Sequence, residues 1–202
     1  MQKKSLITML AALGLVGTVM VGATVAYLSD TTEEKVNVFT VGDVEIEINE
    51  PGWEEEKGQA LEYGATVTKD PQITNTGKND AYVVMEVTGM QSMSQYGFHA
   101  SFDTENWVRI DAEGEIADNS NALVDGTYLY KTKLATGATT KPLFEEVVFT
   151  GDEVEEELEF KLIVKGYAIQ TSQMSALDAE GKETDTPDAG KVYAGLFPQT
   201  GE

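Results

Sequence analysis

The chain has 202 residues, a formal net charge of −21 and no cysteine. The negative charge argues against nucleic acid and anionic lipid as partners, because both would repel the protein. The lack of cysteine excludes disulfides, a thiol nucleophile and zinc–thiolate sites, so the fold must rest on an ordinary hydrophobic core, for which about 175 residues suffice.

Residues 1–26 have the composition of a secretory signal peptide. Lys3 and Lys4 precede a nearly uncharged apolar stretch, and Thr24-Val25-Ala26 resembles a small-x-small cleavage site. We predict that a signal peptidase cuts between Ala26 and Tyr27, which leaves no membrane segment and a net charge of −23 on the remaining chain. The alternative is an uncleaved transmembrane helix, since the stretch is long enough to span a bilayer. Either way the rest of the chain is exported.

Residues 27–42 are predicted to form a polar leader followed by a short strand. In residues 36–41, Val36, Val38 and Thr40 would lie on one side, and Asn37, Phe39 and Val41 on the other. A strand near an N-terminus freed by signal cleavage can pair with a sheet edge of a neighbouring subunit, and head-to-tail repetition gives an open filament. The alternative is that residues 36–41 form the first strand of their own subunit. The candidate donor-strand residues are Val36, Val38, Phe39 and Val41.

Residues 43–197 read as one β-sandwich domain. The segment 43–49 alternates apolar and acidic residues, as a half-buried antiparallel strand does. Seven or more short strands separated by turn signals predict an all-β, jelly-roll-like antiparallel sandwich. The other strand segments are 72–75, 81–88, a hairpin within 106–116, and further strands within 122–135 and 142–170.

Helix signals are confined to the C-terminal part of the domain. Residues 171–181 could form one short helix ending at Gly181, and residues 187–197 another with Asp188 near its start. A polar loop is expected between them. Residues 198–202 are expected to be a loose C-terminal tail.

Catalytic signals are weak, and we predict that the protein is not an enzyme and uses no cofactor. The single histidine, His99, cannot build a zinc site of the HExxH type, which needs two imidazoles one helical turn apart. No Gly-x-Ser-x-Gly turn presents a nucleophile. His99 as a lone ligand or base stays open, but a partly exposed loop histidine is the favoured interpretation.

Two acidic clusters raise the question of calcium. Asp111, Glu113 and Glu115 alternate as in an EF-hand loop, but the glycine falls at loop position 4, and Ala122 stands where a bidentate Glu is needed. We interpret this segment as a solvated hairpin tip. Residues 151–159 are interpreted as the exposed face of a strand. Weak calcium binding by either cluster is the alternative, and no metal site is predicted.

The C-terminal sequence LFPQTGE (196–202) resembles a sortase sorting motif of the Leu-Pro-x-Thr-Gly type, with Phe197 in place of Leu. A sorting signal also needs a following apolar helix and a basic tail. The match is therefore either a coincidence of a short pattern or a sorting signal without its tail.

Several stretches together resemble the TasA/camelysin family of secreted matrix proteins from Gram-positive bacteria. Residues 13–48 resemble that family's glycine-rich signal, its Ala-Tyr-Phe-Ser-Asp junction and its Asn-x-Phe-Thr-x-Gly segment, with Leu28 where Phe is usual. Residues 69–87 resemble its Lys-x-Pro-x-Ile/Val-x-Asn-x-Gly-x-x-Asp-Ala-Tyr-Val pattern. Residues 125–149, followed by 163–170, resemble later segments of the family in the same order. The matching residues at the junction are Ser29, Asp30, Asn37, Phe39, Thr40 and Gly42.

The resemblance implies a jelly-roll-like β-sandwich that is processed by a dedicated signal peptidase, secreted, and assembled into fibres of the extracellular biofilm matrix. Members of that family polymerise by donor-strand complementation, so the implied partner is a second copy of the chain, with a related minor matrix protein as a further possibility. Some relatives are described as metallopeptidases, an activity for which the single histidine offers no zinc site. The alternative functions are a camelysin-like surface metallopeptidase and a sortase-linked pilin or adhesin.

Overall fold

The protein is described by a computed structural model that covers residues 40–41, 44–52, 63–117, 120–151 and 161–198. The helices are α2 (Met90–Ser94) and α3 (Ala189–Leu196). The strands are β1 (Thr40–Val41), β2 (Ile46–Asn49), β3 (Thr66–Thr68), β4 (Gln72–Asn75), β5 (Ala81–Thr88), β6 (Phe98–His99), β7 (Trp107–Ile110), β8 (Gly126–Tyr130), β9 (Glu146–Phe149), β10 (Ile163–Gln170), β11 (Ser175–Leu177) and β12 (Glu183–Pro187).

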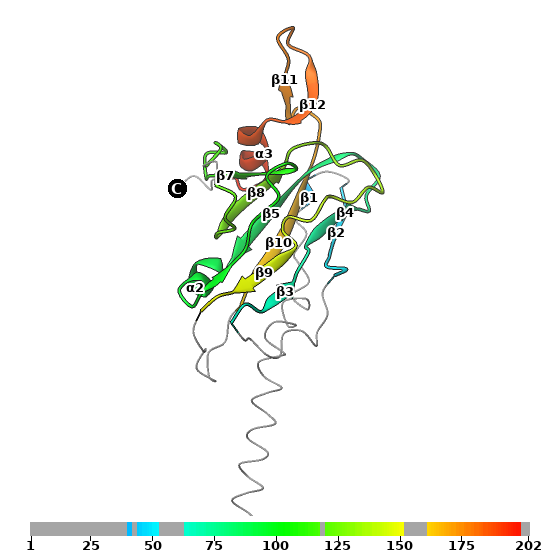
Figure 1. The fold of residues 1–202 in the computed structure, drawn as a ribbon. Helices are drawn as coiled ribbons and strands as arrows, with labels where there is room; N and C mark the ends of the chain where they lie inside the picture. Colours follow the sequence, from blue (N-terminus) through cyan, green and yellow to red (C-terminus); the bar gives the residue numbers. More distant parts are fainter. Residues whose placement is uncertain (1–39, 42–43, 53–62, 118–119, 152–160, 199–202) are drawn as a thin grey trace, which may run out of the picture.

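The strands form a sandwich of two layers, which confirms the predicted fold class (Figure 1). One layer is a five-stranded sheet in the order β1-β10-β5-β8-β7. The other combines the pair β2-β4 with the three-stranded sheet β3-β9-β6. Among the described strands, the pairing of β1 with β10 is parallel and the other pairings are antiparallel.

The central strand β5 is buried on both of its faces. Val83, Met85 and Val87 face the second layer, whereas Tyr82 and Val84 face α3. Because successive side chains of a strand point to opposite faces, a strand covered on both sides becomes an almost continuous apolar run. The sequence Ala81–Thr88 has this character, and the structure confirms the predicted bounds of both β4 and β5.

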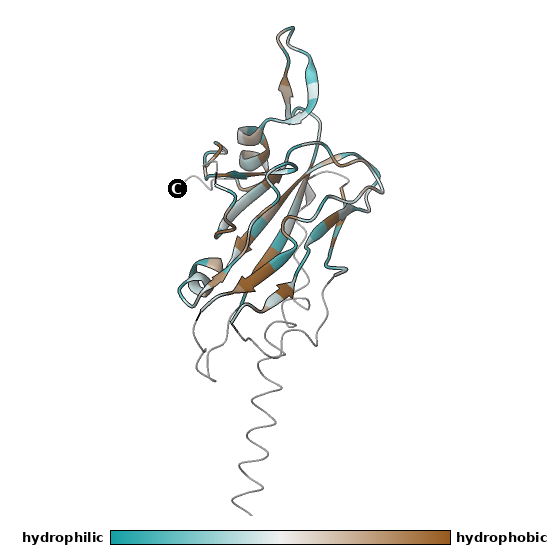
Figure 2. Ribbon diagram, viewed as in Figure 1, coloured by the Kyte–Doolittle hydropathy of each residue, from teal (hydrophilic) through white to brown (hydrophobic). Residues whose placement is uncertain are grey.

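The main core fills the space between the two layers. Its largest fully buried side chains include aromatic residues from four different segments of the chain. Figure 2 shows strong hydrophobic colouring along β9, which contributes to this core, and hydrophilic colouring along β12, which lies outside it. These aromatic residues are Trp107, Tyr128, Phe144 and Phe149.

A smaller core lies on the opposite face of the five-stranded sheet, beneath α3. Val192 and Leu196 of the helix pack there against residues of β5 and β10. The helix begins where it was predicted, because the Asp188 side chain accepts a hydrogen bond from the Lys191 N–H and caps its first turn. The prediction of a short helix at residues 187–197 is confirmed.

The prediction of a helix at residues 171–181 is wrong. This segment contains β11 and a turn, and the predicted polar loop after it contains β12; the two strands pair as a hairpin that projects from the domain (Figure 1). The Asp178 carboxylate accepts hydrogen bonds from the N–H groups of Glu180 and Lys182, and Gly181 has a positive φ of 78°. An Asp side chain that bonds its own backbone two residues on favours a turn over a helix.

Helix α2 was not predicted. Its buried residues Met90 and Met93 join the main core, and the Asp125 carboxylate accepts a hydrogen bond from the Gln91 N–H in its first turn. The capping group therefore comes from a segment 34 residues away, which no local pattern reveals.

Candidate assembly edge

The predicted processing and assembly residues lie mostly outside the described residues. Ala26, Tyr27, Val36, Val38 and Phe39 belong to residues 1–39, which the structure does not describe. Val41 is described, and it forms β1 together with Thr40.

Strand β1 lies at one edge of the five-stranded sheet. Thr40 pairs with Ala168 and Val41 with Ile169, in parallel, while the opposite edge of β10 pairs with β5 along all eight of its residues. Among the described residues, the other six residues of β10 have no strand partner on the β1 side. Unpaired backbone N–H and C=O groups at a sheet edge are a template for adding another strand.

The inner face of β10 carries small or apolar residues, namely Val164, Gly166 and Ala168. Gly166 is required by close packing, because a Cβ atom there would lie 2.6 Å from Ile48 Cδ1 and 3.3 Å from Ile73 Cδ1. The pair β2-β4 therefore lies directly over the middle of β10. Sequence reasoning missed Gly166, although an isolated glycine within an apolar strand is a recognised sign of close approach.

The outer face of β10 is held by Tyr167. Its ring meets the Phe197 ring edge-on with centroids 4.9 Å apart, and its hydroxyl donates a 2.9 Å hydrogen bond to Glu86 Oε2. Burial raises the pKa of Tyr167 to about 12, and the hydrogen bond and the negative charge of Glu86 act in the same direction. Strand β10 is thus anchored to β5 and to the end of α3.

The other edge of the same sheet, at β7, is already covered by its own chain. After Asp111 the chain turns back, so that the Asp111 N–H donates to Glu115 O, the Ala117 N–H donates to Arg109 O, and Ile110 pairs with Ile116. The hairpin predicted within residues 106–116 is confirmed. A returning segment of this kind blocks strand addition. Of the two edges, β10 is the one suited to accept a strand.

In the acidic turn at 111–115, the first carboxylate accepts hydrogen bonds from the backbone of the turn itself. Asp111 Oδ1 accepts hydrogen bonds from the N–H groups of Glu113 and Glu115, and all three residues are exposed. Within the described ranges, no group of three or more His, Asp or Glu residues is arranged to hold a metal ion. The second acidic cluster falls largely on residues 152–160, which lie outside the description.

His99 lies in β6 with its side chain exposed, and its Nδ1 is 3.5 Å from Thr150 Oγ1. At the C-terminus, Leu196 is buried in the smaller core, and the Phe197 ring packs against Tyr167 and Tyr193. The first residues of the sortase-like sequence are therefore part of the folded domain, while residues 199–202 lie outside the described residues.

In the part of the chain that the structure describes, no helix is long and apolar enough to cross a membrane. A scan against protein-family models found no match, and neither did searches of curated proteins and of solved structures.

Proposed function

We propose that the protein is a secreted structural subunit of extracellular matrix fibres, which assembles head-to-tail through its N-terminal strand after the signal peptide is removed. Its main partner is a second copy of the same chain. Its signal peptidase is the only enzyme required for this step, and the protein itself performs no catalysis.

The observation that carries this proposal is the short strand β1 beside β10, whose other six residues have no strand partner on that side among the residues that the structure describes. The two residues of β1 pair with two of the eight residues of β10, the proposed acceptor strand. In the single chain, Thr40 and Val41 occupy this place. In the fibre, the corresponding segment of a neighbouring subunit takes it, and each subunit thereby completes the sheet of the next.

The register of β1 specifies how a longer donor strand would sit. In a donor strand that continued this register toward its N-terminus, Thr40 would pair with Ala168, Val38 would lie opposite Gly166 and Val36 opposite Val164. Residues paired across a parallel ladder point to the same face of the sheet. Val36 and Val38 would therefore point toward the main core, on the face of β10 that Ile48 and Ile73 cover, and Phe39 would lie beside Tyr167 on the other face.

Three chains test the proposal: the mature protein from Tyr27, a chain from Val36 that lacks only the polar leader, and a chain from Asp43 that lacks the candidate donor strand. Electron microscopy and sedimentation should show filaments for the first two and monomers for the third. Filaments of normal appearance from the third chain would contradict the proposal.

A second measurement guards against loss of folding in the shortened chain. A synthetic peptide of residues 27–42, added in excess to the mature protein, should compete for the β10 edge and shorten the filaments. A peptide with the same composition in scrambled order is the control. Equal effects of the two peptides, or no effect of either, would also contradict strand exchange.

A further inference from the structure

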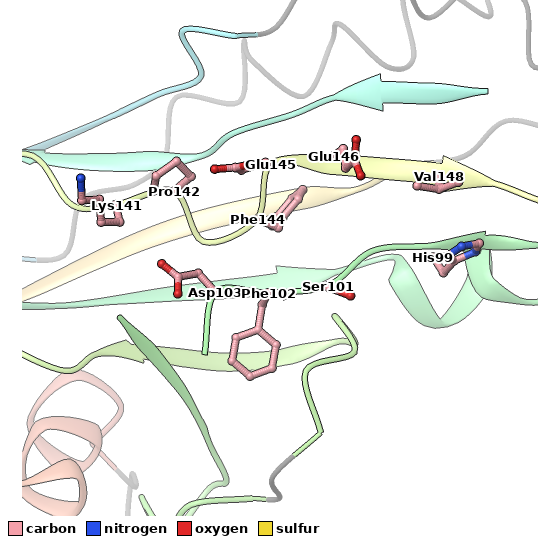
Figure 3. Close-up of a pocket in the computed structure, with 10 residues that line it drawn as sticks. All are labelled: His99, Ser101, Phe102, Asp103, Lys141, Pro142, Phe144, Glu145, Glu146 and Val148. Atoms are coloured by element: carbon pink, nitrogen blue, oxygen red, sulfur yellow. The ribbon is translucent and has the colours of Figure 1, made fainter. Parts of the chain in front are cut away.

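A polar groove opens on the second layer of the sandwich, between β6 and β9 (Figure 3). Its volume is about 340 Å³, at the lower end of the range for pockets that bind small ligands, roughly 300–1,000 Å³. It is separate from the β10 edge, which belongs to the other layer.

The groove exists because the ladder between β6 and β9 splits. The two strands pair at Phe98–Phe149 and at His99–Val148. Beyond His99 the chain moves away from β9, and Ser101 pairs with Ala122. The residues just before β9 remain hydrogen-bonded to the segment after β3, where the Lys69 N–H donates to Glu145 O. The two segments meet again where the Asp103 N–H donates a 2.8 Å hydrogen bond to Leu143 O.

Within the residues that the structure describes, the split leaves the facing main-chain groups of Ser101 and Glu146 without main-chain partners across the groove. In the register of His99 and Val148, the next pair that would exchange hydrogen bonds is Ser101 with Glu146. No hydrogen bond joins these two residues in the described chain. Since Ala100 O and the Phe102 N–H bond to residues 121–123, the N–H and C=O groups of Ser101 face Glu146.

The side chains around this gap add both donors and acceptors. The carboxylates of Glu145 and Glu146, the Ser101 hydroxyl and the Lys141 ammonium are all on exposed residues at the rim. The Phe144 ring points between the two segments but is only 1% exposed, so the half-buried Pro142 ring is the apolar surface that the groove offers (Figure 3).

The Asp103 carboxylate is not available to a ligand in the same way. It accepts hydrogen bonds from the N–H groups of Glu105 and Asn106 and from the Asn106 side chain, at 2.6–3.2 Å. Asp103 thus shapes the end of the groove and leaves recognition to the other rim residues.

We propose that this groove binds a neutral oligosaccharide. A sugar hydroxyl both donates and accepts, so it can bond to a carboxylate or C=O on one side and to an N–H or ammonium group on the other. A pyranose ring also has an apolar face that can lie on the half-buried Pro142 ring. The protein's charge of −21 disfavours an acidic polysaccharide, since long-range repulsion would oppose its approach.

The test is an NMR titration of the full mature protein with cellohexaose and chitohexaose as neutral probes, polygalacturonate as an acidic probe, and calcium chloride as a cation probe. At about 10 mM neutral probe, which detects binding in the millimolar range, the amide signals of His99, Ser101 and Glu146 should shift. The variant Glu146→Gln should weaken binding about tenfold, because a hydrogen bond to a charged acceptor is lost.

Glu47→Gln is the matched control, because Glu47 is an exposed glutamate on β2, which has no place in the groove. It should bind the neutral probe as the unmodified protein does. The proposal is overturned if neither neutral probe shifts the three signals, if only polygalacturonate or calcium does, or if the two glutamine variants weaken binding equally.

Discussion

Lys69 Nζ lies 2.7 Å from Glu50 Oε1 and 2.8 Å from Glu50 Oε2, and the two side chains are only 5% and 8% exposed. Glu50 follows β2 and Lys69 follows β3, so the ion pair links the two sheets of the second layer. The Asp70 carboxylate reinforces this link by accepting a hydrogen bond from the Gly52 N–H. The ion pair thus connects the pair β2-β4 to the sheet β3-β9-β6, which are separate hydrogen-bonded sheets within one layer.

Removing one member of this pair should be costly. Lys69→Met should lower the free energy of unfolding by about 3 kcal/mol, because it leaves the Glu50 carboxylate buried without the Lys69 ammonium. Glu50→Leu should also be destabilising, because it removes an acceptor from the buried Lys69 ammonium. The double variant should lose much less than the sum. Denaturant titrations of the four proteins in a double-mutant cycle measure the coupling.

The exposed ion pair between Lys133 and Asp185 is the matched control, with side chains 39% and 78% exposed. Lys133→Met should change the stability very little, since water screens such pairs. If Lys69→Met is as harmless as Lys133→Met, the buried pair does not stabilise the second layer.

Gly166 and Ile48 should be energetically coupled. Gly166→Ala places a methyl group against the Ile48 side chain and should cost about 1–3 kcal/mol through overpacking. Ile48→Ala should restore part of this loss in the double variant, because it opens the space that the new methyl group needs. Thermal unfolding of the two single variants and the double variant checks this, and simple additivity would contradict the contact.

The cap of α3 should make the helix sensitive to acid. Burial acts to raise the pKa of Asp188, but the hydrogen bonds from Lys191 and Gly190 and the charge of Lys191 outweigh it and hold that pKa below its usual value of 3.8. The carboxylate is therefore favoured in the folded state. Its contribution is present above the ordinary pKa and is lost as the pH falls through the lowered pKa.

Asp188→Ala should lose about 1 kcal/mol of stability at neutral pH. Asp188→Asn keeps a capping oxygen that does not titrate. The free energy of unfolding of this variant should therefore vary less between pH 5 and 2 than that of the unmodified protein, because about one carboxylate fewer contributes to the pH dependence. Denaturation curves across this range provide the measurement. An identical pH profile for the asparagine variant would show that the cap does not contribute.

Tyr167 should make the protein sensitive to alkali. Its pKa is raised from 10.0 to about 12 in the folded state, so its contribution to stability is complete below pH 10 and is lost as the pH rises through 12. Tyr167→Phe should therefore be less stable than the unmodified protein at pH 8, and the difference should shrink toward pH 12. Absorbance titration of Glu86→Gln should show Tyr167 ionising at a lower pH, because the neighbouring negative charge is gone.

The two faces of the proposed donor strand should differ in their tolerance of charge. Val38→Asp should abolish filaments, because it would bury a carboxylate opposite Gly166 without a partner. Asn37→Asp, which adds the same charge on the other face and opposite Lys165, should leave filaments intact. Electron microscopy of both variants decides the matter, and equal behaviour would contradict the proposed register.

The strands that were predicted correctly are those whose pattern follows from burial alone. In β2, Ile46 is buried while Glu47 is exposed, and β5 is apolar because both of its faces are covered. Helix α3 was predictable because Asp188 caps it locally. The hairpin β11–β12 was mistaken for a helix and a loop because its short strands carry few buried side chains and its turn is specified by hydrogen bonds of Asp178.

The sequence by itself determined which residues alternate between core and solvent, and with them the all-β class of the domain, because side-chain periodicity reflects burial within a few residues. Only the tertiary structure decided which strands pair. No local pattern connects the segments that meet in three places. These are the parallel pairing of Val41 with Ile169, the covered edge at β7, and the groove between Ser101 and Glu146. Strand pairing uses backbone groups that every residue carries, so the side chains seldom reveal the partner.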